Sequence, residues 1–224
     1  MWVVSNKYNY LFVHVPKNAG NSLWQSLLER ERFGKILLLQ KKMHMRLSNG
    51  GRNKTIEKII LSPNKLNKEL DLFAKTLSST HARIEDISKI IDKGRLNKLF
   101  KFGVVRNPWD RAVSLYRYHQ YDPNIRKMSF YDYLLNKGEM GMLSQMNWFE
   151  RDGVNVMDAI LKQEDLAEEL PEFMKKLGIK DFNLSHKNAS NRDSDYRKYF
   201  KDKELELVNK YSQKEINRFN YEFM

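Results

Sequence analysis

Residues 100–116 read FKFGVVRNPWDRAVSLY, and this stretch decides the fold class. Phe100 to Val105 is a short apolar run rich in aromatic and β-branched residues, which is typical of a buried strand. Asn107-Pro108 follows; Asn suits a helix N-cap and Pro suits the first helical position. The apolar positions after it share one helical face by their i, i+3, i+4, i+7 spacing: Trp109, Ala112, Val113 and Tyr116. The stretch predicts a strand, a tight turn and a helix.

A second unit of the same kind lies near the N-terminus. Tyr10 to Val15 (YLFVHV) predicts a buried strand, Pro16 to Gly20 breaks it, and Ser22 to Arg32 predicts an amphipathic helix. Strands that alternate with helices indicate an α/β layer fold with a parallel sheet. Both turns then lie at the carboxyl edge of the sheet, where ligands bind. The free N–H groups and the dipole of a helix start favour an anion there.

The rest of the chain predicts further elements of both kinds. Strands are expected at Ile36–Leu39, Thr76–Thr80 and Val156–Leu161. Helices are expected at Ile84–Asp92, where Gly94 ends the helix, and at Phe130–Asn136, Glu164–Lys176, Tyr196–Phe200 and Lys203–Phe219. The part after Ser129 is mostly helical, and no linker rich in Pro, Gly or Ser separates it. We therefore expect residues 1–224 to form a single domain.

Composition excludes several classes of protein. The 224 residues include no Cys, which excludes a disulfide scaffold, zinc ribbons, iron–sulfur clusters and Cys nucleophiles. The net charge of +12 indicates an anionic partner such as a nucleotide, nucleic acid, acidic glycan or membrane surface. No apolar run approaches the roughly 18 residues of a membrane span, and no signal peptide is evident. We expect a soluble protein of the cytoplasm.

The first turn, PKNAGNSL at residues 16–23, has the composition of a phosphate cradle. Ala19 and Gly20 are small enough for a phosphate to approach the backbone closely, Lys17 adds a charge and Ser22 adds a hydroxyl. The order differs from the Walker pattern G-x-x-x-x-G-K-[ST], because the Lys precedes the only Gly. An ordinary turn with an exposed Lys is the alternative interpretation.

The second turn offers an Arg whose planar fork can bind a phosphate with two hydrogen bonds. Arg106 stands where the strand ends, and a salt bridge from the helix to a loop is its alternative role. Ser114 is predicted to lie away from the apolar face of the helix, so that it is either a ligand-binding or a solvated serine. Arg111 is predicted to be structural.

Together these motifs resemble those of sulfotransferases. FVHVPKNAGNSL resembles their 5′-phosphosulfate loop, and FGVVRNPWDRAVSLY resembles their 3′-phosphate motif at nearly every fixed position. The resemblance is closest to the branch of carbohydrate 2-O- and 6-O-sulfotransferases and their bacterial relatives. Weaker similarity continues through Asn147 to Phe149, Glu164 to Leu166, His186 to Tyr199 and Phe219 to Phe223, and so covers most of the chain.

The resemblance implies a P-loop-like three-layer fold with a central parallel sheet flanked by helices and a helical C-terminal part. It implies 3′-phosphoadenylyl sulfate (PAPS) as the donor of a sulfuryl group to an acceptor hydroxyl. The branch that the motifs resemble favours a carbohydrate hydroxyl, and a small-molecule or tyrosine acceptor is left open. Lys17 would stabilise the leaving oxygen, and Arg106 and Ser114 would hold the 3′-phosphate. The 5′-phosphosulfate would be held by Lys17, Asn18, Ala19, Gly20, Asn21 and Ser22. Ala19 departs from a commoner Gly, and Asn21 from a commoner Thr.

The acceptor must lose a proton, so a base must reach it. His81 is our candidate, because it follows a predicted strand and its context THAR, residues 80–83, resembles the segment that supplies the base in the carbohydrate branch. A hydrogen-bonded structural His is the alternative. His14 is predicted to be packed in the core, and His119 to end a helix. His44 lies in a basic loop and His186 in a loop near the donor.

Two other functions remain open from the residues. A P-loop kinase would need a nucleoside triphosphate and Mg²⁺, but the sequence lacks G-K-[ST]. A nucleic-acid-binding protein would suit the net charge, but the basic residues are scattered. No metal is expected, since no H-E-x-x-H or EF-hand spacing occurs and the D-x-D triplet at Asp193–Asp195 suits an N-cap. Lys41–Lys68 and Gln120–Lys127 are expected to line the acceptor.

Overall fold

The structure is a computed structural model of the chain, and it describes residues 2–30, 81–182, 184 and 195–224. Its main sheet has the strand order β1-β2-β3-β6. The strands are β1 (Trp2–Ser5), β2 (Tyr10–Val13), β3 (Phe100–Val105) and β6 (Ala159–Lys162). β2, β3 and β6 run parallel, and β1 pairs antiparallel to β2. The predicted sheet is thus confirmed as mostly parallel, with an antiparallel edge strand that the sequence analysis did not predict.

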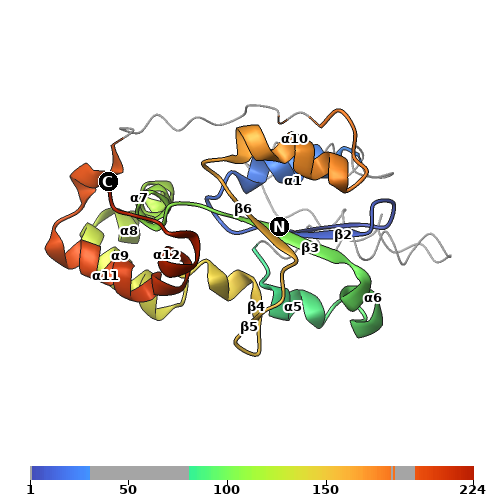
Figure 1. Cartoon of the computed structure of the whole chain (residues 1–224). Helices are drawn as coiled ribbons and strands as arrows, with labels where there is room; N and C mark the ends of the chain where they lie inside the picture. Colours follow the sequence, from blue (N-terminus) through green and yellow to red (C-terminus); the bar gives the residue numbers. More distant parts are fainter. Residues whose placement is uncertain (1, 31–80, 183, 185–194) are drawn as a thin grey trace, which may run out of the picture.

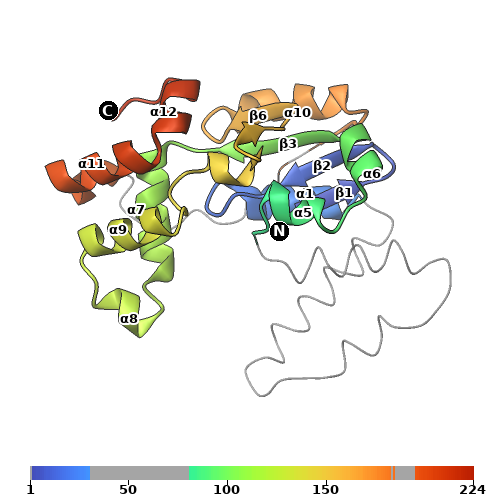
Figure 2. The same ribbon diagram turned by 90° about the horizontal axis from the view of Figure 1, so that it is seen from below.

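The sheet has a hydrophobic core on each face, which makes the fold three-layered. Alternate strand residues point to opposite faces. Tyr10, Phe12 and Phe102 pack with α1 (Gly20–Leu28) and α10 (Leu166–Lys176). The other face carries a core that extends to α5 (Ile84–Ser88), α6 (Lys93–Lys98) and α7 (Pro108–His119). Figure 1 shows α1 and α10 on one side of the sheet and α5 on the other, and Figure 2 views the sheet from the side of α5.

A group of helices lies at one end of the sheet, beyond the carboxyl end of β3 (Figure 1). α7 leads into it, and α9 packs against both α7 and α11. The remaining elements are α8 (Pro123–Arg126), α9 (Phe130–Glu139), the 3₁₀ helices η2 (Met146–Trp148) and η3 (Tyr196–Tyr199), the small hairpin β4 (Glu150–Arg151) with β5 (Val154–Asn155), α11 (Asp202–Tyr211) and α12 (Gln213–Phe219). This arrangement confirms the predicted helical C-terminal part.

Most predicted elements in the described residues are found, with two corrections. The prediction that Gly94 ends a helix is wrong, because Gly94 lies inside α6. The predicted Ile84–Asp92 helix ends early, at Ser88, and a second helix starts at Lys93, because the Asp92 side chain accepts a hydrogen bond from Arg95 N. The predicted Lys203–Phe219 helix is likewise two helices, which meet at the buried Ser212.

Several predictions fall outside the described residues. They include the strands at Ile36–Leu39 and Thr76–Thr80, the acceptor stretch Lys41–Lys68, and His44 and His186. Asp193 of the D-x-D triplet is also outside them. Asp195 of the same triplet is an N-cap as predicted, because its side chain accepts a hydrogen bond from Arg197 N at the start of η3.

Candidate active site

The turns after β2 and β3 lie side by side at the carboxyl edge of the sheet. We call residues 16–22 the first corner and residues 106–110 the second corner. The Arg106 Nη1 donates to the carbonyl oxygen of Lys17 at 2.8 Å, across 89 residues of sequence. Asn18 Nδ2 donates to the carbonyl oxygen of Val104 at 2.7 Å. The structure therefore brings the two predicted phosphate motifs into direct contact.

The first corner has an unusual backbone. Lys17 and Ala19 have φ of 70° and 53°, in the left-handed region that favours glycine. Each such residue costs on the order of 1 kcal/mol. Left-handed residues are a component of the backbone nests that bind anions. Ala19 is the N-cap residue of α1 and makes no side-chain cap, so no capping side chain occupies the N–H groups of this helix start.

Gly20 begins α1 and lies directly against the buried ring of His14. A Cβ at Gly20 would stand 1.7 Å from His14 Cδ2, so no other residue fits without displacing that ring. His14 is packed as predicted, with 3% of its surface exposed. Its ring centroid lies 5.0 Å from that of His81. The ring of His14 therefore lies between Gly20, at the start of α1, and the ring of His81.

The backbone of His81 is held by Trp148. His81 has φ of 66°, and its carbonyl oxygen accepts a hydrogen bond from Trp148 Nε1 at 3.0 Å. The guanidinium groups of Arg83 and Arg111 lie 5.3 and 5.6 Å from the Trp148 ring. These contacts fix the indole, and through it the position of His81.

The side chain of Asn18 points into the protein rather than toward a ligand. Its amide nitrogen donates to Val104 O and to Gln145 Oε1, and the residue is 1% exposed. If Asn18 contributes to donor binding, only its backbone N–H is placed to do so. Asn21 and Ser22 lie in the first turn of α1, next to Gly20.

The second corner is capped by its own side chain. Asn107 Oδ1 accepts hydrogen bonds from Trp109 N and Asp110 N, both at 3.1 Å, and Pro108 is the first residue of α7, as predicted. These bonds occupy N–H groups that an anion could otherwise use. Anion binding here must therefore depend on side chains.

Arg106 is the side chain placed to do so. It is 9% exposed, and its Nε donates to Asp110 Oδ2 at 2.7 Å, with Nη2 bonded to the same oxygen. The salt bridge considered as its alternative role is thus present. It orients the guanidinium at the junction of the two corners, because Nη1 is bonded to Lys17 O.

One face of α7 runs from the second corner along the first. Asp110, Ser114 and Tyr118 follow at four-residue spacing and so share this face. Ser114 is 7% exposed, so the alternative of a solvated serine is wrong, although its spacing still places it away from the apolar face of α7. At the far end, Lys17 Nζ lies 4.5 Å from the centroid of the Tyr118 ring.

His119 adds a titratable group beside this end of the site. Its Nδ1 lies 2.6 Å from the hydroxyl of Tyr133. Burial, with the ammonium groups of Lys137 and Lys17, lowers the pKa of His119. The influence of Lys17 places His119 within electrostatic reach of the first corner.

Arg111 holds the base of the site, as predicted for a structural residue. Its Nε donates to Pro16 O, and its Nη1 donates to Met142 O and Leu143 O, all at 3.0 Å. Burial lowers the pKa of Arg111 to about 10, which leaves it charged at neutral pH. It ties the start of the first corner to the segment after α9.

Sequence reasoning missed Gln145 and the role of Trp148. Gln145 is fully buried and contacts both corners, and Trp148 positions His81. Trp148 lies in a stretch noted only for weak similarity. Gln145 contacts Asn18 across 127 residues, and no local pattern marks such a contact.

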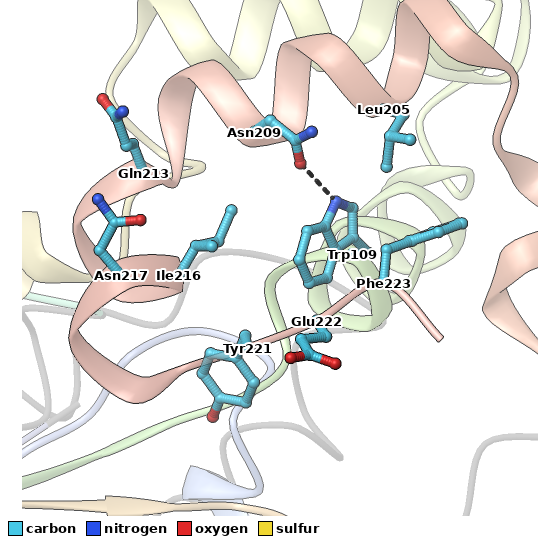
Figure 3. Close-up of a pocket in the computed structure, with 9 residues that line it drawn as sticks. All are labelled: Trp109, Leu205, Asn209, Gln213, Ile216, Asn217, Tyr221, Glu222 and Phe223. Carbon is cyan, nitrogen blue, oxygen red and sulfur yellow. Dashed lines mark hydrogen bonds between the residues drawn. The ribbon is translucent and has the colours of Figure 1, made fainter.

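A separate pocket of about 420 Å³ lies between the start of α7, α11, α12 and the C-terminal segment (Figure 3). Trp109 lines it, and its Nε1 donates to Asn209 Oδ1 at 3.0 Å. Its other lining residues come from α11, α12 and the C-terminal segment: Leu205, Gln213, Ile216, Asn217, Tyr221, Glu222 and Phe223. None of the predicted site residues lines it.

Comparisons with known proteins bear on this geometry. A family model described as the sulfotransferase family matches residues 1–222. No curated protein and no solved structure matched the chain. Across residues 2–30, 81–182, 184 and 195–224, no helix is long and apolar enough to cross a membrane. The same part of the chain holds no group of three or more His, Asp or Glu residues arranged to bind a metal ion.

Proposed function

This chain belongs to the sulfotransferase family, and from that premise we propose that it transfers a sulfuryl group from PAPS to a hydroxyl of a carbohydrate. The contact between the two corners carries the proposal. One ligand that has anionic groups at both ends could bind the backbone N–H groups of the first corner and Arg106 of the second at once. A kinase or a nucleic-acid-binding protein does not require this pairing.

The first corner fits the 5′-phosphosulfate. Lys17 and Ala19 have the left-handed conformation that anion-binding turns use, and no side chain caps the start of α1. Gly20 adds no side chain at this helix start, where it packs against His14. The second corner fits the 3′-phosphate, because Arg106 is held by Asp110 and Ser114 lies one helical turn further along the same face. The family membership favours a sulfuryl donor over a nucleoside triphosphate.

Bound PAPS would supply a sulfuryl group attached to a good leaving oxygen. In the proposed reaction His81 accepts the proton of the acceptor hydroxyl while that oxygen bonds to sulfur. Lys17 stabilises the negative charge that forms on the bridging oxygen as its bond to sulfur breaks. The products are a sulfate ester and adenosine 3′,5′-bisphosphate, and the proton remains on His81.

The acceptor is proposed to bind beyond Lys17, over the end of α7. Tyr118 and Tyr121 are 57% and 70% exposed, and their ring centroids are 5.8 Å apart. Aromatic faces of this kind suit the apolar face of a sugar ring. Arg117, Arg126 and Lys127 are also exposed in residues 117–127, and their charges suit an acidic glycan.

Donor binding is tested first. We expect adenosine 3′,5′-bisphosphate to raise the melting temperature and to bind without magnesium in calorimetry, and ATP to bind far more weakly. Labelled PAPS offered with a panel of acidic glycans then identifies the acceptor. Tighter binding of ATP with Mg²⁺ than of the bisphosphate would support a kinase instead.

The base is tested separately. His81→Ala is expected to abolish transfer and leave the affinity for adenosine 3′,5′-bisphosphate within about threefold of the original, because the imidazole acts on the acceptor. His119→Ala serves as the comparison, since His119 also lies near Lys17. Transfer at the original rate in His81→Ala would remove His81 from the mechanism.

The acceptor surface has its own test. Tyr121→Ala should raise KM for the glycan several-fold and leave the nucleotide affinity unchanged, because Tyr121 lies beyond Lys17 from the donor corners. Tyr8→Ala is the control, because Tyr8 lies just before β2, at the opposite end of that strand from the first corner. An unchanged KM in Tyr121→Ala would place the acceptor elsewhere.

A further inference from the structure

Gln145 lies between the two corners and is fully buried. Its Oε1 accepts hydrogen bonds from Asn18 Nδ2 at 2.6 Å and from the backbone N of Arg106 at 2.9 Å. Its Nε2 donates to the backbone carbonyl of Arg106 at 2.8 Å. One side chain thus joins a side chain of the first corner to both backbone groups of the key residue in the second.

The carboxamide of Gln145 acts here as a substitute for a neighbouring strand. The pairing of β3 with β6 ends at Val105 and Lys162, so the ladder provides no partner for Arg106. Gln145 offers the same donor and acceptor pair that a peptide group would offer. It extends the order of β3 by one residue, into the second corner.

Gln145 is itself held from the C-terminal side of the protein. Its backbone N donates to Glu215 Oε1 at 2.8 Å, and Ser144 Oγ donates to Glu215 Oε2 at 3.3 Å. Glu215 belongs to α12 and is fully buried. The position of the carboxamide is therefore fixed by groups that do not belong to either corner.

This link differs from the other contact between the corners. Arg106 Nη1 also bonds Lys17 O, but the guanidinium is the group proposed to bind the 3′-phosphate. A phosphate there would compete for the same donors. The bonds of Gln145 involve the Arg106 backbone, and they remain available when the guanidinium turns to a ligand.

We propose that Gln145 is a positioning residue that fixes the separation of the two corners, so that both ends of a doubly phosphorylated nucleotide bind together. The inference rests on the proposed function. When one end of such a ligand is bound, the affinity gained at the other end depends on how well the second site is placed. Loss of the link therefore weakens a two-ended ligand and spares one-ended ligands.

The test compares three nucleotides by calorimetry: adenosine 3′,5′-bisphosphate, adenosine 5′-monophosphate and adenosine 3′-monophosphate. Gln145→Met keeps the length of the side chain and removes its hydrogen bonds. We expect the affinity for the bisphosphate to fall about 10- to 100-fold, and that for each monophosphate by less than about threefold. Gln213→Met makes the same change at an exposed glutamine of α12, outside both corners, and should change none of the three affinities.

A near-isosteric variant guards against a failure of Gln145→Met to fold. Gln145→Glu keeps the oxygens that accept from Asn18 and Arg106 and loses the donor, so we expect a selective loss of about 3- to 10-fold for the bisphosphate. Equal losses for all three nucleotides, or no loss for the bisphosphate, would overturn the inference. A wild-type protein that binds all three nucleotides equally weakly would instead contradict the proposed function.

Discussion

The two corners follow neighbouring parallel strands and each begins a helix, yet they are stabilised in opposite ways. The first keeps two non-glycine residues, Lys17 and Ala19, in the left-handed region and leaves α1 without a side-chain cap. The second uses Asn107 and Pro108 to complete the start of α7. The difference teaches that a helix start can serve either as a backbone site for an anion or as a rigid support for side chains. It cannot serve fully as both, because a capping side chain uses the same N–H groups.

The largest effect is expected at Lys17. Lys17→Ala should lower kcat about 100- to 1,000-fold, because the charge on the leaving oxygen loses its ammonium partner, and should weaken nucleotide binding by less than about tenfold. Lys7→Ala is a matched control, since Lys7 also lies over a tyrosine ring, at 4.7 Å from Tyr8, but away from the corners. A loss in nucleotide affinity as large as the loss in kcat would mean that Lys17 acts mainly in donor binding, the role proposed for Arg106.

The next effect concerns the support beneath the second corner. Burial raises the pKa of Glu215 to about 7, from an ordinary value of 4.5. The folded protein binds this proton more tightly than the unfolded chain, so its stability falls as pH rises from about 4.5 to 7 and then levels. The loss in the free energy of unfolding reaches about 3 kcal/mol at pH 8, and Glu215→Gln removes it because the amide does not ionise.

Urea unfolding at pH 5 and pH 8 measures this effect. The free energy of unfolding of Glu215→Gln, relative to the original protein, should increase between the two pH values by about 2 to 3 kcal/mol. Glu206→Gln, which alters an exposed glutamate of α11, should show no such increase. A pH-independent difference for Glu215→Gln would mean that the carboxyl titrates normally. The first corner, which depends on backbone strain, should not contribute to this pH dependence.

Arg106 should affect binding more than rate, in contrast to Lys17. Arg106→Ala is expected to weaken adenosine 3′,5′-bisphosphate binding by about 1 to 3 kcal/mol, the range for a charged hydrogen bond. Calorimetry on Arg117→Ala provides the comparison, because Arg117 is an exposed residue of the same helix. Unchanged affinity in Arg106→Ala would mean that Arg106 does not bind the nucleotide and serves only in the ion pair with Asp110.

The smallest effect tests the strain of the first corner. Ala19→Gly should stabilise the protein by up to about 1 kcal/mol, because glycine adopts the left-handed conformation without a steric cost. Ala112→Gly, in the interior of α7, should destabilise it by about 1 kcal/mol or more. Urea midpoints of the two variants should therefore move in opposite directions. A lower midpoint for Ala19→Gly would show that the corner is not strained.

The local sequence pattern predicted most helices and strands correctly, but it predicted several of their boundaries incorrectly. The strand Phe100–Val105 and the Asn107-Pro108 helix start are found as predicted, because buried strands and helix caps have strong local signals. Gly94 does not end a helix as predicted, because the Asp92 side chain starts α6 and includes Gly94 in it. Ser114 is buried rather than solvated, which helical periodicity does not predict because burial depends on what packs against the helix.

The amino-acid order alone predicted that two strand–turn–helix units belong to a parallel sheet, and the motifs in their turns resemble those of the sulfotransferase family, to which the chain belongs. The tertiary structure alone decided that the turns touch, that His14 places His81 near Gly20, and that Gln145 and Glu215 brace the junction. The physical reason is range. Caps, turns and strand patterns arise within a few residues, whereas the hydrogen bonds of Gln145 join segments 39 and 127 residues apart.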